Sequence, residues 1–137
     1  PIHVFLLIPL FLITVLEVKK HFNQEIEKLY RDEIKFISVR EFNQKMKEEK
    51  LIVVDVRPFE EYSKFHIPNA ISLPFKSNAP EYKIINTIDK DKQLLFYCES
   101  GTCGSAKVVA DQFYRRGYYH IYVLREGIEE WKNLKIQ

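Results

Sequence analysis

The chain has 137 residues, enough for one domain with a sizeable core and too few for two domains of ordinary size. A hydrophobic content of 46% and a charged content of 29% are typical of a globular protein, and a formal net charge of +2 from interleaved acids and bases argues against nucleic-acid binding. Two cysteines do not make a secreted disulfide framework and the four histidines lack metal-ligand spacing, so we expect no metal and no cofactor.

An apolar segment begins the chain. Residues 4–16 carry no charge and Ile2 extends the apolar character upstream, but a membrane-spanning helix needs roughly 20 such residues. Pro9 disfavours a uniform helix here, and no basic region precedes the segment as in a signal peptide. We interpret residues 1–16 as a membrane segment, or as the remnant of a span whose upstream part is missing, so that residues 2–16 tether the protein to a membrane. The alternative is a buried helix or strand.

Charged residues follow this segment. Lys19 and Lys20 come directly after it, and by the positive-inside rule that flank and the domain beyond it lie in the cytoplasm. A soluble cytoplasmic protein is the alternative. Apolar residues then recur at helical spacing among charges, which predicts an amphipathic connecting helix over residues 17–35.

Residues 36–137 alternate between strand-like and helix-like patterns. This alternation indicates one α/β domain with a mainly parallel central sheet flanked by helices, whose functional site lies beyond the carboxyl ends of the strands. The predicted elements, in chain order, are a strand at 36–39, a helix at 41–49, a strand at 51–54, a short helix at 60–65, a short strand within 67–73, a loop at 76–80, a helix at 81–88, a strand at 93–97, a helix at 105–116, a strand at 120–124 and a helix at 128–134.

Both cysteines lie in one loop between a predicted buried strand and a helix, Cys98-Glu99-Ser100-Gly101-Thr102-Cys103. Backbone N–H groups and the positive end of the helix dipole converge at such a position, so we expect the loop to stabilise a thiolate at Cys98. The N–H groups from Glu99 to Gly104 would form the anion-binding loop, and Gly101 allows backbone conformations that a curved loop needs.

Three sets of motifs surround this loop in a fixed order. They are Asp55-Val56-Arg57 with Glu61-Tyr62 and His66-Ile67-Pro68-Asn69-Ala70; Tyr97-Cys98 with Gly101, Ala106 and Ala110; and Gly117-Tyr118 with Val123-Leu124, Gly127 and Trp131. In this order and spacing, residues 36–134 resemble rhodanese-like domains.

The resemblance implies a single-domain sulfurtransferase of rhodanese-like fold. In this family the loop cysteine, here Cys98, takes a sulfane sulfur from a donor and holds it as a persulfide. A thiol or another nucleophilic acceptor, a small molecule or a protein, then removes the sulfur. A thiolate nucleophile stabilised by backbone N–H groups suits each step without a metal.

Several residues depart from the family pattern. Cys103 stands where Arg or Thr is common, and Glu99 adds an anion beside the nucleophile. We therefore expect thiosulfate to be a poor donor and a thiol persulfide to be a better one. Phe65 and Glu126 stand where glycine is usual, which predicts an altered pocket rim. Phosphatases of this fold end a longer loop with Arg, whereas Gly104 stands here, so phosphatase activity is not expected.

Some roles stay open at this point. Asp55 and Arg57 form an internal ion pair, or Arg57 contributes a positive field to the pocket. Cys103 either resolves a persulfide or sulfenic acid on Cys98 through a Cys98–Cys103 disulfide, or fills space passively. The alternative functions are accordingly a thiol redox or sensor module that cycles this disulfide, and a non-catalytic rhodanese-homology binding domain.

Overall fold

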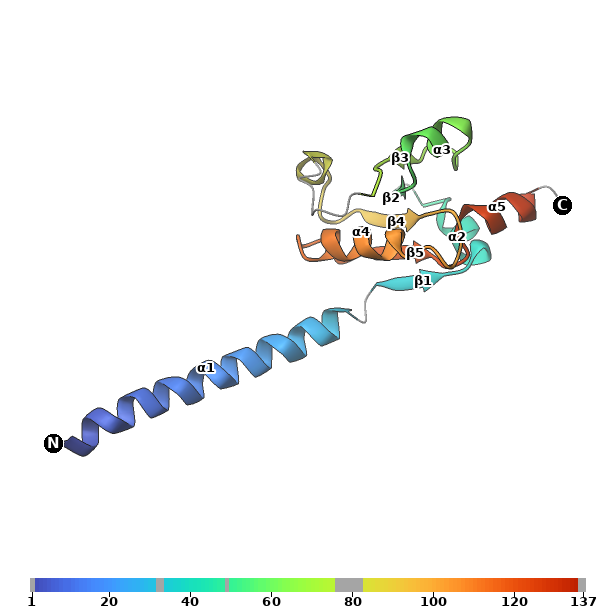
Figure 1. Cartoon of the computed structure of the whole chain (residues 1–137). Helices are drawn as coiled ribbons and strands as arrows, with labels where there is room; N and C mark the ends of the chain where they lie inside the picture. The colour runs from blue at the N-terminus through green and yellow to red at the C-terminus, as the bar shows by residue number, and fades with distance from the viewer. Residues whose placement is uncertain (1, 32–33, 49, 76–82, 136–137) are drawn as a thin grey trace. The chain divides into compact units, whose positions relative to one another are not determined.

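The computed structural model describes residues 2–31, 34–48, 50–75 and 83–135, and it divides the chain into two compact units, residues 1–32 and 33–137 (Figure 1). The predicted loop at 76–80 and the first two residues of the predicted helix at 81–88 lie outside the described residues.

The first unit is a single helix, α1 (Ile2–Arg31). It continues through Pro9, although a proline removes one backbone hydrogen bond and its ring crowds the preceding turn, because the leucines and isoleucines around it favour or tolerate a helix. The helix also crosses the expected boundary between residues 16 and 17 without a break. Its apolar side chains between residues 12 and 22 are exposed, with Leu16, Val18 and Phe22 at 61%, 69% and 64%, and Ile26 is half-buried. Within the described part of the chain, no helix has the length and apolar character needed to cross a membrane.

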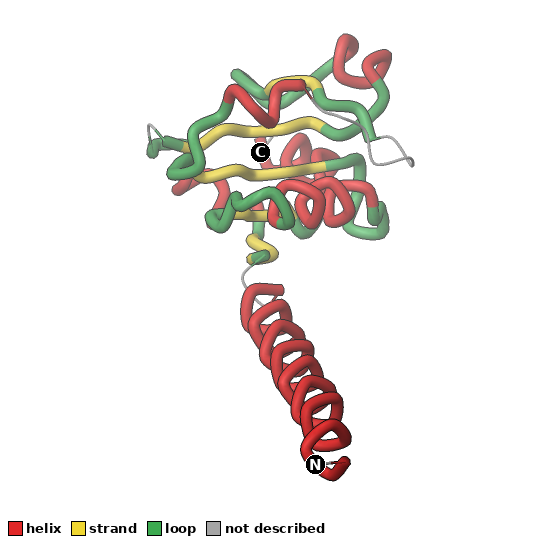
Figure 2. The backbone as a smooth tube through the Cα atoms, turned by 90° about the vertical axis from the view of Figure 1, so that its left-hand side faces the viewer, coloured by secondary structure: helices red, strands yellow, loops and turns green. Residues whose placement is uncertain are grey.

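The second unit is built on a parallel sheet of five strands in the order β1-β5-β4-β2-β3, which confirms the predicted α/β class (Figure 2). β4 lies in the middle and pairs with β2 from Leu51↔Gln93 to Asp55↔Tyr97. The carboxyl ends of β2 and β4 therefore lie side by side. The strands are β1 (Lys35–Ile37), β2 (Leu51–Asp55), β3 (Ile71–Ser72), β4 (Gln93–Tyr97) and β5 (Ile121–Leu124).

In the described residues of the second unit, three α-helices and one 3₁₀ helix connect the strands, and a fourth α-helix follows the last strand. They are α2 (Val39–Lys45), α3 (Phe59–Lys64), η1 (Lys83–Thr87), α4 (Ser105–Tyr114) and α5 (Gly127–Lys135). The helix expected at 81–88 is thus a 3₁₀ helix over its described part. α2 starts earlier than predicted because Ser38 and Glu41 form a capping box, in which the Ser38 N–H donates to Glu41 Oε2 at 2.7 Å. Ser38 and Val39 therefore begin a helix instead of ending a strand.

Alternate residues of β4 point to opposite faces of the sheet, as the two-residue period of a strand requires. Leu94 and Phe96 belong to the core on the α4 side, where Phe96 packs edge-on against Phe113. Leu95 and Tyr97 belong to the core on the other side, which α2 and α5 cover. Cys98 follows Tyr97 and, by the same alternation, belongs to the core on the face of the sheet that α4 covers.

Candidate active site

Cys98 follows directly after β4, at the edge of the sheet where the sequence predicts the site. A backbone turn closes the loop, with the Cys103 N–H donating to the Ser100 carbonyl at 3.1 Å. The start of α5 holds the other side of the loop. There the Ile128 N–H donates to the Cys98 carbonyl at 3.0 Å and the Glu129 N–H donates to the Glu99 carbonyl at 3.1 Å. Backbone groups from distant parts of the chain therefore fix the position of the loop.

Two glycines permit this close approach. Gly127 has φ +75°, and a Cβ there would lie 2.6 Å from the Glu99 carbonyl oxygen. A Cβ on Gly101 would lie 2.9 Å from the Arg125 carbonyl oxygen. Among the described glycines, only Gly117 and Gly127 have a positive φ. Gly101 is therefore needed because a side chain would clash with the Arg125 backbone, and not for the special backbone conformation that we expected.

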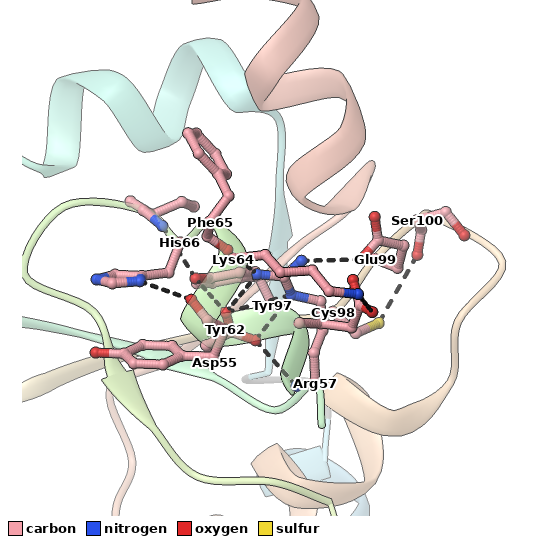
Figure 3. A network of polar contacts seen from close by, with 12 residues as sticks. Asp55, Arg57, Tyr62, Lys64, Phe65, His66, Tyr97, Cys98, Glu99 and Ser100 are labelled. Carbon is pink, nitrogen blue, oxygen red and sulfur yellow. Dashed lines mark hydrogen bonds and ion pairs between the residues drawn. The ribbon is translucent and has the colours of Figure 1, made fainter. Parts of the chain in front are cut away.

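The Cys98 side chain is buried, with 3% of its surface exposed. Its thiol faces two carbonyl oxygens of its own loop. The Cys103 oxygen lies at 3.2 Å, and the Ser100 oxygen lies at 3.8 Å (Figure 3). Burial and the interaction with Cys103 raise the pKa of Cys98 to about 12, although backbone groups of Ala106 and Ser100 act in the opposite direction. The expectation of a stabilised Cys98 thiolate is thus wrong for the free dithiol, because burial outweighs the N–H groups.

Cys103 is half-buried and interacts directly with Cys98. Burial alone would raise the pKa of Cys103, but hydrogen bonds with Cys98 and with Ser105 outweigh it and lower the pKa overall. Both cysteines are free thiols. The two thiols therefore form a pair that gives up its first proton readily and its second only at high pH.

We expect this pair to titrate in two separated steps. The first step lies at the lowered pKa of Cys103, and the second, at the raised pKa of Cys98, lies near pH 12. In Cys103→Ser the second thiol and its charge are gone, so Cys98 should titrate in one step with a pKa below 12. Thiolate ultraviolet absorbance measured against pH checks both curves. A single step at the same pH in both proteins would contradict the pairing.

Arg57 and Asp55 form a buried ion pair at the end of β2, with 3% and 0% of their surfaces exposed. The contact has two points, Arg57 Nη2 to Asp55 Oδ2 at 2.8 Å and Nε to Oδ1 at 3.1 Å. The Tyr97 hydroxyl also donates to Asp55 Oδ2, at 2.7 Å. The internal ion pair, one of our two readings of these residues, is confirmed.

Arg57 also reaches the cysteine loop. Its Nη1 lies 2.9 Å from Glu99 Oε2, so the guanidinium lies between two carboxylates (Figure 3). Burial acts against its charge, but the hydrogen bonds to Asp55 and Glu99 outweigh burial and raise the pKa of Arg57. Arg57 thus remains charged, and its charge is balanced within the protein. We missed the pairing with Glu99, because the two residues lie 42 positions apart and no local pattern links them.

A pocket of about 730 Å³ opens beside the two cysteines. Among the described residues that line it, three are acidic and one is basic. Phe59 and Phe75 add an aromatic surface, which we did not predict. The lining residues are Val56, Arg57, Pro58, Phe59, Glu60, Glu61, Pro74, Phe75, Cys98, Glu99, Cys103 and Ser105.

The other predicted site residues lie outside this lining. Ser100, Gly101, Thr102 and Gly104 shape the loop behind the pocket, and Asp55 supports Arg57 from within the core. Phe65 and Glu126, which we expected at the rim, do not line the described pocket either; the Phe65 ring packs against Trp131, with ring centroids 6.1 Å apart.

Comparison with known proteins gives consistent matches. A family model described as the rhodanese-like domain matches residues 38–134. The chain is similar to the thiosulfate sulfurtransferase GlpE of Coxiella burnetii, with 34% identity over 87 residues that make up 64% of this chain and 77% of that protein. It is also similar to the thiosulfate:glutathione sulfurtransferase of Saccharomyces cerevisiae, with 32% identity over 92 residues, or 59% and 64% of the two chains.

The fold has a solved counterpart as well. The crystal structure of the BH2092 protein from Bacillus halodurans matches with a TM-score of 0.65 and 28% identity, and the match covers 85% of this chain and 82% of that chain. The residues that the family model matches include Asp55, Arg57 and the loop from Cys98 to Gly104.

Proposed function

The chain belongs to the rhodanese-like domain family, which includes sulfurtransferases similar to it, and we propose that it carries a sulfane sulfur as a persulfide on Cys98. The observation that carries this proposal is the position of Cys98. It is the buried cysteine of a loop at the carboxyl end of β4, it lines an open pocket, and it lies beside a second thiol.

The cysteine pair supplies the nucleophile for this reaction. One negative charge is shared by two interacting thiols, so a proton that moves from Cys98 to Cys103 leaves a thiolate on Cys98. That sulfur attacks the sulfane sulfur of the donor, and the rest of the donor leaves with the electron pair of the broken bond. A thiol acceptor then attacks the outer sulfur of the persulfide and releases the Cys98 thiolate.

The pocket lining favours a thiol persulfide over thiosulfate as the donor. Thiosulfate is a dianion, and Glu60, Glu61 and Glu99 line the pocket while the charge of Arg57 is balanced by carboxylates. The apolar part of the lining suits the carbon skeleton of a thiol. Both sulfurtransferases compared above have thiosulfate in their names, so the proposed donor differs from theirs.

A sulfur-loading experiment tests the proposed function. The reduced protein is mixed with cysteine persulfide, and the tryptic peptide 93–107, which contains both cysteines, is weighed by mass spectrometry. We expect the peptide to gain one sulfur atom, placed on Cys98 by fragmentation, and to lose it when a thiol acceptor is added. A peptide that neither gains a sulfur atom nor loses two hydrogens, in the wild type and in Cys103→Ser alike, would overturn the proposal.

Neutralising Glu99 should improve thiosulfate as a donor. In Glu99→Gln the pocket loses one negative charge and Arg57 keeps only Asp55 as a charged partner, so we expect kcat/KM for thiosulfate to rise about 3- to 10-fold. Asp91→Asn is the matched control, since Asp91 precedes β4 at the opposite end of the strand from Cys98. Steady-state kinetics with both donors measures the change. An equal effect of the two substitutions would exclude this electrostatic explanation.

The two alternative functions differ in their support. The interaction between Cys98 and Cys103 favours a redox role for the pair. A non-catalytic binding domain has no need for a cysteine in a pocket, so it is the weaker alternative.

We further propose that residues 2–16 tether the protein to a membrane and hold the domain on the cytoplasmic side. The lack of charge in this segment and the lysines that follow it support the proposal. Cosedimentation with lipid vesicles, compared between the full chain and a chain without residues 2–16, measures the tether. Equal binding of the two would argue for a soluble protein.

A further inference from the structure

Cys98 and Cys103 lie at opposite ends of their loop and meet at the pocket. The turn from Cys103 to Ser100 folds the loop back, and the Cys98 thiol lies 3.2 Å from the Cys103 carbonyl oxygen. Both side chains line the pocket. A sulfur bound to Cys98 would therefore form within reach of a second nucleophile of the same chain.

The two thiols differ in burial and in how readily they ionise. Cys98 is buried, whereas Cys103 is half-buried and interacts with Ser105 at the start of α4. These surroundings lower the pKa of Cys103, so it is the more readily ionised thiol of the pair. The more readily ionised thiol of a pair is the better placed to act as the nucleophile in thiol–disulfide exchange.

We propose that Cys103 resolves the Cys98 persulfide and releases its sulfur as hydrosulfide. In this step the Cys103 sulfur bonds to Sγ of Cys98 and the bond from Sγ to the sulfane sulfur breaks. The departing sulfur takes the electron pair of that bond and the proton that Cys103 gives up. The sulfane sulfur is reduced to sulfide, and the two cysteines are oxidised to a disulfide.

The contact between the thiols favours attack on the inner sulfur. Cys103 interacts with Sγ of Cys98 itself, which becomes the inner sulfur of the persulfide, while the added sulfur occupies space in the pocket. An external acceptor that enters the pocket meets the outer sulfur first. Two outcomes thus compete at one site: transfer of sulfur to an acceptor thiol, and release of sulfide through the disulfide.

The cycle closes with a reductant of the thiol class. Two thiol molecules, or one dithiol, reduce the Cys98–Cys103 disulfide and are themselves oxidised to a disulfide. Over one cycle the protein therefore converts a thiol-persulfide donor and two reducing thiols into sulfide, the free thiol of the donor and an oxidised thiol. This inference rests on the proposed persulfide at Cys98.

A single-turnover experiment tests the resolving role. The reduced protein is loaded with cysteine persulfide without oxygen and desalted, and then sulfide and the mass of peptide 93–107 are followed. For the wild type we expect sulfide release together with a peptide that has lost two hydrogens, the mark of the disulfide. In Cys103→Ser we expect the peptide to keep the added sulfur at least about tenfold longer. Cys103→Ala repeats the test if the serine variant folds poorly.

Other results of this experiment would overturn either the resolving role of Cys103 or the proposed function. Equal persulfide lifetimes in the wild type and both variants would overturn the resolving role while leaving sulfur carriage on Cys98 intact. Sulfur found on Cys103 would also overturn it, because that result shows a relay between the cysteines. If no variant that retains Cys98 gains sulfur, the proposed function itself fails. Cys98→Ser mixed with the donor measures sulfide that comes from the donor alone.

Discussion

Replacing Cys98 by serine should abolish sulfur loading and lower kcat/KM for sulfur transfer by about a thousandfold or more, because the reaction then lacks its nucleophile. A serine hydroxyl is similar in size to the thiol but does not ionise in the working pH range. Mass spectrometry of peptide 93–107 and steady-state transfer from a thiol persulfide measure the two effects.

The loss in Cys98→Ser should come from chemistry and not from unfolding. A serine hydroxyl can donate to the carbonyl oxygens of Cys103 and Ser100, which the thiol faces in the native protein. We therefore expect circular dichroism and the thermal midpoint to change little. Full transfer activity in this variant would refute the persulfide mechanism at Cys98.

The second large effect is expected on stability. Arg57→Met removes the cation from a buried ion pair and leaves the fully buried Asp55 carboxylate with the Tyr97 hydroxyl and a backbone N–H. Removing one partner of such a pair costs about 3–5 kcal/mol of unfolding free energy, since the remaining charge is no longer compensated. Urea denaturation of both proteins measures the difference.

An exposed arginine provides the matched control. Arg115 pairs with Asp111 four residues earlier on α4, and its side chain is 63% exposed. We expect Arg115→Met to cost no more than about 0.5 kcal/mol, as is usual for such helix pairs. The double variant Asp55→Leu with Arg57→Met should recover part of the loss, because no buried charge remains. A loss in Arg57→Met no larger than in the control would contradict the role of the buried pair.

Prediction of the fold succeeded where elements have a strong local pattern. β4 has the predicted bounds, Gln93–Tyr97, and α5 and β5 differ from their predicted ranges by at most one residue at each end. The start of α2 was missed although its signal was present, because Ser38 and Glu41 have the spacing of a capping box. The 3₁₀ geometry of η1 has no comparable signal in its amino-acid pattern.

The structure brings the two cysteines of the predicted loop to one pocket, but it differs from the expected electrostatics of that loop. The strand–loop–helix pattern placed Cys98 and Cys103 together, because both belong to one short loop. The rise in the pKa of Cys98 depends on burial, which the loop sequence does not contain. The balance of charge at Glu99 depends on Arg57, which follows a different strand.

The amino-acid sequence by itself determined the α/β class, the loop that holds both thiols and the family to which they belong, because these are encoded in local spacing. Tertiary structure alone decided how acidic each thiol is and how much charge the pocket holds. Parallel pairing brings the ends of β2 and β4 together, and there Arg57 meets Glu99 and burial separates the pKa values of two thiols in one loop. Desolvation and charge pairing depend on neighbours in space, so they arise only when distant segments pack together.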